Sequence, residues 1–556
     1  MKKLKAKTTA SPPTKRQNNK LFPLCNTPAP TKYLLLIFLS GLGLLAPVKS
    51  TNASTPPPAL TAAPANPEFT TWQMDMETSG PEIYDEQGYA LGHIPSPLDR
   101  THLKYQKATL PTDKSLPASY DLRSLGYVTS VKEQGYCGSC WTFATYGSLE
   151  SYLLKSETET WDFSENHLKN YHGFDWGPCD GGNPDMSTAY LAQWQGPVDE
   201  SDDPYHDWDD RPSPGGPAQK YLKNALWFFS YTDIKNAIMN HGALDADMYW
   251  NDAYYNSFNY TYYYNGSSSP NHEITIAGWD DNKPVSGAPG NGAWLIKNSW
   301  GTSWGDSGYF WISYYDSQAV TYAVAFCNAV PDSTYLTNYQ YDPLEWTMNV
   351  GYGSSIAWAA NIFTATAKES LKAVALYAVD DSVAYQIYIY DNFSGSSFSG
   401  LLGSTSGTLT NSGYHTISLP TAIDLTNGDD FSIVAKFTTT GYGYPIPVEA
   451  DFIGYSSGAT ANSGESYISS SGSTFTDITI YSGYENTNIC IKGLTVPITD
   501  YNKDEIVNFL DYQYFADAWG TSFGEPGFDD IYDLSDNNIV DLPDLAIFSD
   551  SWLWQL

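Results

Sequence analysis

The chain has 556 residues and a formal charge of −34, from 62 Asp and Glu against 28 Lys and Arg. At about 100–200 residues per domain, this length predicts three or four domains. Aromatic residues make up 15% of the chain, enough to build packed cores, which excludes disorder throughout. The scarcity of basic residues argues against nucleic acid as a partner, because a phosphate-binding surface needs clustered Lys and Arg.

Residues 1–50 have the composition of a secretory signal peptide. They contain nine Lys and Arg and no acid, and an apolar run from Tyr33 to Val48 leads to the small residues Ser50 and Ala53. We therefore predict a secreted or cell-surface protein, and removing nine positive charges from −34 leaves −43. An uncleaved membrane anchor is the alternative, although the run is short and interrupted by glycine for a span of ~20 residues.

The six cysteines have to be interpreted for that oxidising compartment. Cys25 is lost with the predicted signal peptide, and an odd number remains. Four of the remaining cysteines can pair, so one thiol is expected to stay free. The five are Cys137, Cys140, Cys179, Cys327 and Cys490.

Segments of different composition and predicted structure lie between the predicted signal peptide and residue 329. Residues 51–115 are predicted to be a Pro- and Ala-rich linker followed by a polar, turn-rich segment. Residues 116–329 combine a helix, predicted from Cys140 to Leu154, with strand-like runs such as ITIAGW, GAWLIKNSW and GYFWISYY. Small residues on that helix predict close packing on both faces, which would compensate the ~1 kcal/mol that Gly147 costs in a helix interior.

The rest of the chain has two further patterns. In residues 330–497, runs such as YQIYIYDNF and DFSIVAKFT alternate with Gly, Ser and Asn turns, which predicts an antiparallel β-sandwich or barrel. Residues 498–556 contain an internal repeat, DYNKDEIVNFLDYQYFADAW from Asp500 and DLSDNNIVDLPDLAIFSDSW from Asp533, offset by 33 residues. Two copies predict two paired loop–helix units.

One group of motifs points to nucleophilic catalysis. Gln134 begins the run QGYCGSCWTF, in which Cys140 opens the predicted helix, where the helix dipole favours a thiolate. A thiolate nucleophile needs an imidazole partner that is oriented by a third group. His272 follows Cys140 by 132 residues and begins a predicted strand, and Asn298 lies 26 residues further, in NSWGTSWGDSG.

These motifs resemble those of the papain-like cysteine peptidases, whose signature is a CGSCW run with His and Asn downstream. The resemblance implies that Cys140 is the nucleophile, that His272 protonates the leaving amine and that Asn298 orients its ring. It also implies that Trp300 shields that hydrogen bond and that Gln134 forms part of the oxyanion hole. It implies a two-lobed α+β fold with a helical lobe and a β-barrel lobe, protein or peptide substrates and no cofactor for catalysis.

Further motifs extend the resemblance over roughly 210 residues of the chain. LPASYDLRSLGYVTSVKEQ is similar to the mature N-terminus of the family, and Gly181 and Gly182 in CDGG match its substrate-binding glycine wall. The resemblance pairs Cys137 with Cys179. Two alternatives remain open. One is that CGSC is a redox pair or half of a zinc site, although no second such motif occurs. The other is that the chain is a catalytically inactive relative of the family.

The sequence departs from the family pattern in HGALDADMY, where the family often has an apolar strand. Asp245 and Asp247 are candidates to line the pocket for the side chain two residues before the scissile bond, which predicts tolerance of basic side chains there. Acids on a solvated strand edge are the alternative. Residues 68–115 occupy the propeptide position, and YALGHIPSPLDRTHLK resembles a short prokaryotic pro-segment, so we expect a zymogen; a permanent N-terminal extension is the alternative.

The C-terminal regions resemble two binding modules. AWAANIF, YQIYIY and NICIKG, in residues 330–497, are similar to the lectin-like sandwich that follows some prokaryotic peptidase domains, which makes carbohydrate a candidate ligand. Cys327 and Cys490 flank this region, and we predict a bond between them. Residues 498–556 resemble a dockerin module, which implies a cohesin-like scaffold partner.

The repeat has calcium-loop spacing, with oxygen ligands at positions 1, 3, 5, 7, 9 and 12 of each loop. Glu505 and Asn538 replace the usual glycine at position 6, and Ser535 is a weak ligand. We predict Ca²⁺ in both loops; an acidic helical tail without an ion is the alternative. The predicted ligands, with carbonyl oxygens at position 7, are Asp500, Asn502, Asp504, Ile506, Asn508, Asp511, Asp533, Ser535, Asn537, Ile539, Asp541 and Asp544.

The sequence therefore predicts a secreted, multidomain cysteine endopeptidase with a β-sandwich and a small all-α calcium-loop module. The predicted regions are a signal peptide (1–50), a linker and propeptide (51–115), a catalytic domain (116–329), a sandwich (330–497) and a repeat module (498–556). The alternative from a different class is a cell-surface adhesion or scaffold protein in which binding dominates and proteolysis is secondary.

Overall fold

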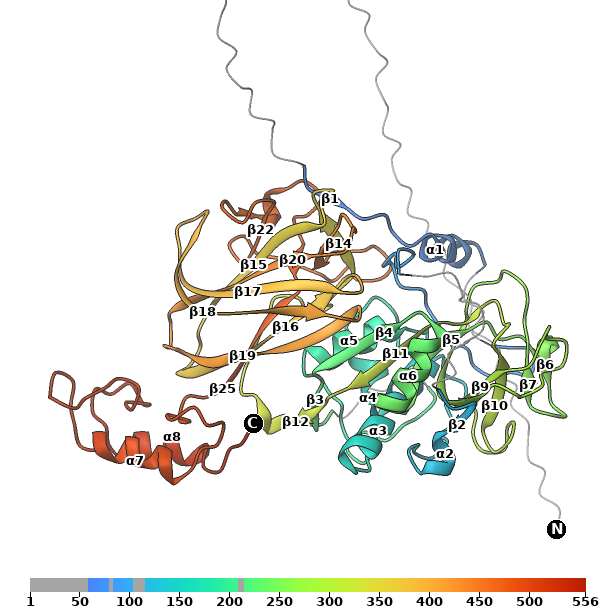
Figure 1. The fold of residues 1–556 in the computed structure, drawn as a ribbon, viewed down its shortest axis with the longest axis horizontal. Coiled ribbons are helices and arrows are strands. Elements are labelled where there is room, and N and C mark those ends of the chain that lie inside the picture. The colour runs from blue at the N-terminus through green and yellow to red at the C-terminus, as the bar shows by residue number, and fades with distance from the viewer. Residues whose placement is uncertain (1–58, 80–83, 104–115, 209–214) are drawn as a thin grey trace, which may run out of the picture. The chain divides into compact units, whose positions relative to one another are not determined.

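The computed structural model describes residues 59–79, 84–103, 116–208 and 215–556 (Figure 1). The predicted signal peptide and the beginning of the predicted linker lie outside the described residues. Within the described ranges, no helix is both long enough and apolar enough to cross a membrane.

The N-terminal segment packs against the rest of the chain through backbone pairing and aromatic contacts. Strand β1 (Thr61–Ala62) pairs antiparallel with β14 (Met348–Gly351), and helix α1 (Pro67–Ser79) follows it. Phe69 of α1 is fully buried and contacts Tyr455 edge to face, with ring centroids 5.6 Å apart. This segment is therefore anchored by residues that lie almost 400 positions further along the chain.

The helical half of the catalytic region is built around one buried helix, α3 (Cys140–Tyr152), which continues into a π-helical turn, η1 (Leu153–Glu157). Every residue of α3 is buried, which confirms the prediction of packing on both faces. A Cβ on Gly147 would lie 2.4 Å from Thr275 Oγ1, so glycine allows the helix to approach the sheet. The surrounding helices are α2 (Leu122–Leu125), α4 (Glu165–Tyr171) and α5 (Pro184–Ala192).

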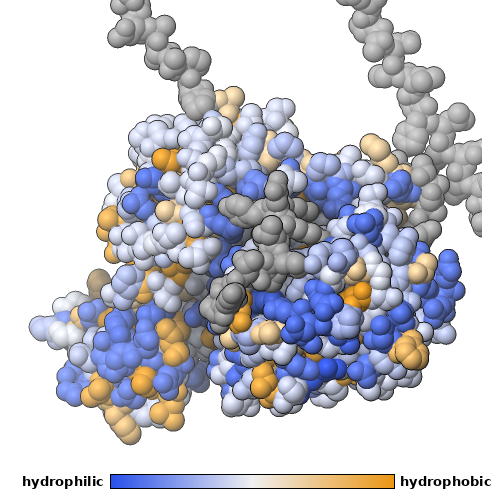
Figure 2. All heavy atoms as spheres, turned by 45° about the vertical axis from the view of Figure 1, so that its right-hand side comes forward, coloured by the Kyte–Doolittle hydropathy of each residue, from blue (hydrophilic) through white to orange (hydrophobic). Residues whose placement is uncertain are grey.

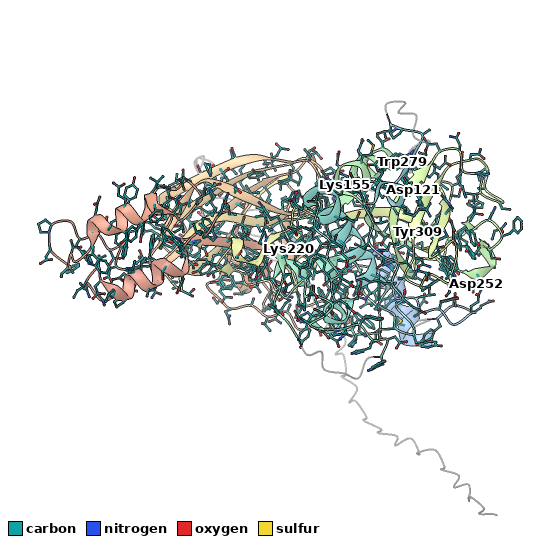
Figure 3. All side chains as sticks on the ribbon, turned by 90° about the horizontal axis from the view of Figure 1, so that it is seen from below. Asp121, Lys155, Lys220, Asp252, Trp279 and Tyr309 are labelled. Atoms are coloured by element: carbon teal, nitrogen blue, oxygen red, sulfur yellow. A yellow bond between two sulfur atoms is a disulfide. The ribbon has the colours of Figure 1, made fainter. Side chains whose placement is uncertain are left out.

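The other half of the catalytic region is a largely antiparallel sheet in the order β4-β11-β5-β8-β9-β10. Its strands β8, β9 and β10 are the three predicted from ITIAGW, GAWLIKNSW and GYFWISYY. β2 pairs with β8 beside Trp279, in the half of the molecule that also contains Tyr309 (Figure 3). The strands are β4 (Asn224–Phe228), β5 (Leu244–Met248), β8 (His272–Asp280), β9 (Ala293–Lys297), β10 (Tyr309–Ser313) and β11 (Ala319–Cys327).

Shorter elements connect these strands. Helix α6 (Tyr231–His241) begins at Ser230, whose side chain accepts a hydrogen bond from the Asp233 backbone N–H. The remaining short elements of this region are β2 (Ser119–Asp121), β3 (Lys220–Tyr221), η2 (Asp252–Tyr254), β6 (Tyr255–Asn256) and β7 (Thr261–Tyr262).

Residues 330–497 form the predicted β-rich region, with two sheets around one apolar core. One sheet has the order β18-β17-β20-β15-β22-β23, and the facing strands are β13, β25, β16 and β19, with β14, β21 and β24 beside them. Alternate residues of β17 such as Ile387 and Ile389 point into the core, while Tyr388 and Tyr390, each next to Ile389, are partly exposed. This period of two follows from the strand pleat and explains why the sequence predicted these strands.

The elements of this region are β12 (Val330–Pro331), η3 (Asp332–Thr334), β13 (Asn338–Tyr339), β15 (Ile356–Thr364), β16 (Glu369–Ala378), β17 (Val383–Phe393), β18 (Phe398–Leu409), β19 (Gly413–Leu425), β20 (Asp430–Thr438), β21 (Ile446–Glu449), β22 (Ser466–Ser469), β23 (Thr476–Asp477), η4 (Ile478–Ile480), β24 (Asn488–Ile489) and β25 (Ile491–Pro497).

The sheet of the catalytic region continues into the sandwich. β4 pairs antiparallel with β19, with Ala225 opposite Tyr414, so the two regions share one 13-stranded sheet. At this junction a Cβ on Gly413 would lie 2.1 Å from the Ala225 carbonyl oxygen. Hydrogen bonds between paired strands therefore cross the boundary that the composition predicted between two independent domains.

The cysteine pairing is partly as predicted. Cys137 and Cys179 form a disulfide, whereas Cys327 and Cys490 are free and buried, so the predicted bond between them is wrong. Cys327 ends β11 and Cys490 directly precedes β25, and three strands separate β11 from β25 in the sheet. At ~4.8 Å per strand, four steps span about 19 Å, well beyond the reach of a disulfide.

Residues 498–556 contain two short helices, each preceded by one of the repeated loops. They are α7 (Phe509–Ala518) and α8 (Leu542–Asp550), and both begin with a capping box. A small core that includes Val507, Phe515, Val540 and Phe548 lies between them. The predicted pair of loop–helix units is therefore present.

Candidate active site

Cys140 lies at the first position of α3, where the positive end of the helix dipole stabilises negative charge on sulfur. Its side chain is completely buried. The backbone N–H of Glu273 donates to Cys140 Sγ at 3.3 Å, so the start of β8 is held against the thiol. Because Glu273 follows His272 in the chain, this contact brings the predicted histidine to the cysteine.

His272 and Asn298 are joined by a hydrogen bond of 2.9 Å between His272 Nε2 and Asn298 Oδ1. Antiparallel pairing of β8 with β9 produces this contact, because His272 begins β8 and Asn298 directly follows β9. The Trp300 ring lies on the histidine, with centroids 4.7 Å apart. Within the described residues, Nδ1 of His272 has no hydrogen-bond partner, which leaves that nitrogen available to the thiol.

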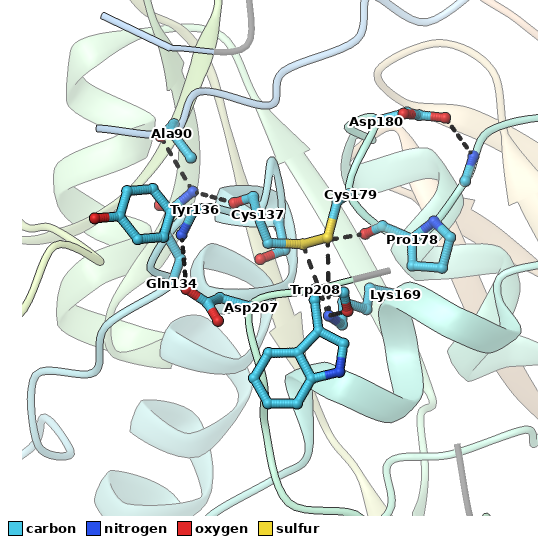
Figure 4. Close-up of a disulfide and its surroundings, with 12 residues drawn as sticks. Ala90, Gln134, Tyr136, Cys137, Lys169, Pro178, Cys179, Asp180, Asp207 and Trp208 are labelled. Atoms are coloured by element: carbon cyan, nitrogen blue, oxygen red, sulfur yellow. Dashed lines mark hydrogen bonds between the residues drawn. A yellow bond between two sulfur atoms is a disulfide. The ribbon is translucent and has the colours of Figure 1, made fainter. Parts of the chain in front are cut away.

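Gln134 is fully buried beside the same cleft. Its Oε1 accepts a hydrogen bond from Ser299 Oγ at 2.6 Å, which fixes the orientation of the amide. Its Nε2 donates to the Cys137 carbonyl at 2.9 Å and to the Ala90 carbonyl at 3.1 Å (Figure 4). The indole N–H of Trp300 also donates to the Ala90 oxygen, so a carbonyl oxygen occupies the place to which these donors point.

That carbonyl belongs to an N-terminal segment that crosses the cleft. The N–H groups of Gly92 and His93 both approach the Asn271 carbonyl at 3.1 Å, and Gly182 N–H donates to the Gly92 carbonyl at 2.9 Å. Ile94 N–H donates to the Gly182 carbonyl at 2.8 Å, and the pairing of His93 with Gly182 is parallel. Residues 90–94 therefore cover the candidate catalytic residues.

The glycines of CDGG are needed for this close approach. Gly181 has φ +118, and a Cβ there would lie 2.8 Å from the Gly92 carbonyl oxygen. A Cβ on Gly182 would lie 2.4 Å from the Trp141 ring. Glycine at 181 therefore leaves room for the extended segment, and glycine at 182 leaves room for the wall to pack against Trp141.

The burial of Cys140 and His272 under residues 90–94 shifts the pKa values of both groups. Burial raises the pKa of the Cys140 thiol well above its usual value of 9.0. Burial lowers the pKa of His272 from 6.5 to about 4, against the opposing effect of its bond to Asn298. In the covered cleft burial therefore favours the neutral form of both groups, because neither charged form is solvated.

Asp245 and Asp247 lie on β5, between β11 and β8, and both are buried, so the alternative of a solvated edge is wrong. Asp247 accepts hydrogen bonds from the backbone N–H and the hydroxyl of Thr321, at 2.8 and 2.5 Å. Asp245 accepts from Thr145 at 3.1 Å. Asp247 also lines a small cavity beside the cleft-crossing segment.

Sequence reasoning missed a third carboxylate at this place, Glu273. Its Oε1 lies 2.6 Å from His93 Nδ1 and accepts a hydrogen bond from the Tyr322 hydroxyl at 3.0 Å. The available signal was the acid that directly follows the histidine in NHEITIAGW. Only the fold reveals that this acid lies beside Asp245 and Asp247 on neighbouring strands.

The disulfide holds the two loops that flank the cleft. Cys137 and Cys179, which are 42 residues apart, form the disulfide drawn in Figure 4. Gly138 N–H donates to the Cys179 carbonyl at 3.1 Å. Tyr136 N–H donates to Asp207 Oδ2 on the other side of the Cys137 loop. The bond therefore connects the loop before Cys140 to the glycine wall.

The predicted calcium ligands lie in two separate loops with similar hydrogen bonding. In the first, Asp500, Asp504 and Asp511 have carboxylate oxygens within 4.8 Å of one another. Asp511 and Asp544, at position 12 of the two loops, are fully buried and accept corresponding backbone N–H bonds, from Asn502 and Asn508 in the first loop and from Ser535 and Asp541 in the second.

The loop geometry fits a cation with oxygen ligands. The side-chain oxygen of Ser535 is buried without a hydrogen-bond partner in the described structure. Glu505 and Asn538, at position 6, have φ +70 and +67, so both occupy the left-handed region where the usual glycine is favoured.

Family models match two regions of the chain. Residues 116–328 match the papain family of cysteine proteases, and residues 338–495 match a lectin-like domain. Cysteine proteinase 3 of Entamoeba histolytica is 35% identical over 213 residues, covering 35% of this chain and 63% of that protein. Mouse cathepsin K is 29% identical, covering 43% of this chain and 72% of that protein. The chain spans about three fifths of the length of several of these relatives.

Two solved structures extend the similarity beyond the catalytic region. The cysteine protease and lectin-like domains of Cwp84, a surface-layer-associated protein of Clostridium difficile, give a TM-score of 0.66 at 27% identity, covering 79% of this chain and 98% of that one. A Cys-to-Ala variant of Cwp84 after propeptide cleavage gives a TM-score of 0.61 at 29% identity, covering 68% of this chain and 99% of that one.

Proposed function

Because the chain carries a papain-family cysteine peptidase domain followed by a lectin-like domain, we propose that it is an exported endopeptidase that uses Cys140, His272 and Asn298 to cleave proteins. The observation that carries this proposal is the convergence of the three side chains. The thiol lies at a helix N-terminus, against the strand that begins with His272, and that histidine is bonded to Asn298 at 2.9 Å.

The chemistry follows from these positions. The thiolate of Cys140 attacks the peptide carbonyl carbon, and the Gln134 amide stabilises the negative charge that develops on the carbonyl oxygen. The imidazolium of His272 gives its proton to the leaving amine, which leaves a thioester on Cys140. Water then attacks the thioester while His272 takes its proton, the Cys140 thiolate leaves, and the carboxylic acid is released with the thiolate–imidazolium pair restored. Asn298 and Trp300 hold the ring in place throughout.

We also propose that the protein is made as a zymogen, in which residues 84–103 act as the inhibitory segment. The contacts of Ala90, Gly92 and Ile94 with Gln134 and Gly182 support this proposal, because they occupy the positions that substrate needs. Removal of the segment would return water to the cleft and reverse the effects of burial, so that the thiolate–imidazolium pair can form.

Covalent labelling tests the nucleophile. An epoxide inhibitor of cysteine peptidases should label the processed protein once, and intact mass and peptide mapping should locate the label on Cys140. Cys140→Ala should abolish both labelling and cleavage of casein, whereas Cys327→Ala, which removes a buried thiol of the same domain, should retain both. Labelling that persists in Cys140→Ala would refute the assigned nucleophile.

The zymogen proposal has a separate test. The unprocessed protein should cleave a small fluorogenic peptide at least ~100-fold more slowly than the processed form. Gly92→Trp, which places a bulky side chain where a Cβ would already lie 2.1 Å from the Gly138 carbonyl oxygen, should release this inhibition. Full activity of the unprocessed wild-type protein would instead support a permanent N-terminal extension.

A second proposed function concerns residues 498–556, which we infer to be a calcium-dependent docking module for a cohesin-like scaffold protein. Supporting observations are the paired carboxylate loops and large apolar side chains that are exposed at equivalent positions of the two repeats. Phe509 and Leu542 are 76% and 70% exposed, and Tyr514 and Ile547 are 47% and 41% exposed. Figure 2 shows hydrophobic patches, in orange, beside hydrophilic ones on the surface of the molecule. A repeated, exposed apolar pattern favours a binding face.

Calorimetry with Ca²⁺ should detect two binding events in the full chain, and a chelator should abolish them. Asp511→Asn and Asp544→Asn should each remove one event, with Asp517→Asn, on α7 outside the loop, as the matched control. An immobilised cohesin domain should retain the protein only when Ca²⁺ is present, and Phe509→Ser with Leu542→Ser should weaken retention. Binding of the ion without retention by cohesin would leave the calcium proposal standing and refute this partner.

We further propose that the protein acts outside the cell or at its surface and that the lectin-like domain is a carbohydrate-binding or substrate-positioning module. The association of Cwp84 with a surface layer supports this location. If adhesion or scaffolding dominates instead, Cys140→Ala should retain the biological function of the protein. If proteolysis dominates, that variant should lose the function while it still binds its partners.

A further inference from the structure

We infer that Lys492 and Asp342 of the lectin-like region become joined by an intramolecular amide bond, formed with the help of Glu345. This modification site lies outside the active site, and its chemistry does not depend on the peptidase. The observation that carries the inference is a buried contact of three side chains, the lysine cluster, in which Lys492 Nζ lies 2.9 Å from Asp342 Oδ1 and 2.7 Å from Glu345 Oε1. Amide formation needs an amine, a carboxyl group that it attacks and a second group that moves the protons.

Two paired strands bring the lysine cluster together. Lys492 is the second residue of β25, and β13 pairs antiparallel with β25. Shortly after β13 the chain makes a tight turn, in which the Glu345 N–H donates to the Asp342 carbonyl oxygen at 3.0 Å. Glu345 has φ +57, a strained value for a residue other than glycine, and such strain persists only where the surrounding structure fixes the residue. Both carboxyl groups are therefore held at the ends of one turn, beside the lysine.

The lysine cluster is shielded from water. The side chains of Lys492, Asp342 and Glu345 are 1%, 0% and 2% exposed. Tyr377 and Tyr414 are buried aromatic neighbours of the cluster, with ring centroids 5.2 Å apart. Three ionisable groups are therefore held in surroundings that penalise charge, and bulk water has no access to the carboxyl carbon.

These surroundings favour a neutral amide over the charged groups from which it forms. Burial raises the pKa of Asp342 and Glu345, against the attraction of Lys492. Burial also acts to lower the pKa of Lys492, but the two carboxylates outweigh it, so that this pKa is raised and the ammonium is the resting form. A buried ion pair retains a desolvation cost that an amide does not have. Loss of water from the ammonium and the carboxylate therefore relieves this cost.

The reaction balances without any further reactant. A proton passes from the Lys492 ammonium to the Asp342 carboxylate, which gives an amine and a carboxylic acid. The nitrogen lone pair attacks Cγ of Asp342, and Glu345 takes a proton from the nitrogen and gives it to the departing hydroxyl group. One C–N bond forms, one C–O bond breaks, one water leaves, and Glu345 is a carboxylate again. The fixed contact between the groups supplies the high effective concentration that this step requires.

Lys372, in the same region, forms an ordinary ion pair and serves as a comparison. Its Nζ lies 2.7 Å from Glu505 Oε1, but the Glu505 side chain is 50% exposed. Within the described residues no second carboxylate forms an ion pair with this ammonium. Water can solvate the charges of such a pair, and no neighbouring group is placed to move the protons, so we expect no bond there.

The amide would fasten the last strand of the lectin-like region to its beginning. Asp342 and Lys492 are 150 residues apart in the chain. Cys327 and Cys490, which were predicted to staple this region, are free. A cross-link that closes a long loop removes conformational freedom from the unfolded chain, and an amide, unlike a disulfide, is not opened by thiols.

Mass spectrometry of the full chain, after reduction of its disulfide, tests the bond. The wild type should be about 18 Da lighter than the mass calculated from its sequence and its own N-terminus, because one water is lost. Trypsin should fail to cut the denatured protein after Lys492, because the amide removes the charge of that side chain. The peptide of residues 437–503 should then be linked to the peptide of residues 298–368, and fragmentation should locate the link between Lys492 and Asp342.

Variants test the part that each group plays. Lys492→Arg and Glu345→Gln should have their full calculated masses, whereas Lys372→Arg, the matched control, should show the same loss of water as the wild type. Asp342→Asn should still form the link, now with a loss of about 17 Da, because ammonia leaves in place of water. Circular dichroism shows whether each variant is folded, and the measurement on the wild type requires no variant to fold.

Three results would overturn the inference. The full calculated mass for the wild type, with cleavage after Lys492, would show that the cluster is a buried ion pair only. A loss of about 17 Da from the wild type would place the link on Gln340, whose Oε1 also lies 2.7 Å from Lys492 Nζ, rather than on Asp342. A loss of water that persists in folded Lys492→Arg would show that the dehydration occurs elsewhere in the chain.

Discussion

The side chains of the candidate site depend on one another at the scale of single residues. His272 can shuttle a proton only if one nitrogen faces the thiol, and the bond from Nε2 to Asn298 fixes which nitrogen that is. The Trp300 ring lies over this pair, and its own N–H is bonded to the Ala90 carbonyl. A small change at Asn298 should therefore act through the orientation of the histidine.

Asn298→Ala should lower kcat/KM of the processed enzyme by about 100-fold without loss of the fold, because a misaligned imidazole can neither activate the thiol nor protonate the amine efficiently. The measurement is steady-state hydrolysis, normalised to the number of thiols titrated by an irreversible inhibitor. Asn298→Gln, which retains the amide on a longer side chain, should recover only part of the loss. Wild-type activity of Asn298→Ala would show that the asparagine does not position the ring.

At the scale of elements, the fit between helix α3 and strand β8 decides the geometry of the site. Cys140 begins α3 and His272 begins β8, so the distance between these two elements determines whether thiol and imidazole meet. Gly147 sets this distance, since even a methyl group there would lie 2.4 Å from Thr275 Oγ1 and 3.1 Å from Thr275 Cγ2. Helix propensity and packing therefore oppose each other at this residue.

Gly147→Ala should lower the free energy of unfolding by up to about 2 kcal/mol. Alanine gains ~1 kcal/mol of helix propensity, but overpacking a rigid core costs about 1–3 kcal/mol. Urea denaturation measures the sign of the change in the free energy of unfolding. Adding Thr275→Ala to Gly147→Ala should restore stability, because it removes the Thr275 atoms that the alanine methyl group contacts. Gly458→Ala, at an exposed glycine with no atom within 4 Å of its Cβ, is the control and should change little.

At the junction of β4 and β19, a buried histidine makes the free energy of unfolding depend on pH. His415 of β19 lies opposite Asn224 of β4, and its Nε2 bonds the Asn411 carbonyl at 2.8 Å. Burial lowers the pKa of His415 from 6.5 to about 4, against the opposing effect of that bond. Between these pH values the unfolded chain binds a proton that the folded chain does not, so the stability contribution of neutral His415 is present above 6.5 and is lost as pH falls toward 4.

His415→Phe should remove this contribution. The difference in unfolding free energy between the wild type and the variant should shrink by up to about 3 kcal/mol as the pH falls from 7 to 4. Chemical denaturation at several pH values measures it, and the comparison cancels the titration of all other groups. Parallel curves for the two proteins would contradict the assignment.

At the scale of the whole molecule, the catalytic and lectin-like regions are parts of one folded body. They share the 13-stranded sheet, and Arg100 lies between Trp227 of one region and Trp346 of the other. Trp227 is 2% exposed in the intact chain. Separation of the two regions would expose this apolar surface and turn β4 into an edge strand, which promotes association with other chains.

We therefore expect a single cooperative unfolding transition for the catalytic and lectin-like regions in scanning calorimetry of the full chain. A fragment of residues 116–329 alone should melt several degrees lower or aggregate, because each kcal/mol lost lowers Tm by about 2–4 °C in a domain of this size. Calorimetry with size-exclusion chromatography distinguishes the two results. A fragment that melts at the same temperature as the intact protein would show that the regions are independent.

Much of the fold and of the candidate site could be predicted from the sequence. The buried helix after CGSC, the strands of both β regions and the two loop–helix units were predicted because each has a pattern within 10–20 contiguous residues. Glu273 was missed, because an acid beside a histidine has no distinct meaning until strand pairing places it next to Asp245. The bond between Cys327 and Cys490 was predicted wrongly, because position along the chain does not reveal that three strands lie between them.

By itself the sequence determined the candidate nucleophile, its histidine and asparagine, the glycine wall and the repeated carboxylate loops, because each consists of particular residue types at short, fixed spacings. The tertiary structure alone decided the burial of Glu273 beside Asp245 and Asp247, the coverage of the cleft by residues 90–94 and the sheet shared by two regions. These features join residues up to 210 positions apart. Such contacts depend on the register of whole strands, which no local pattern specifies.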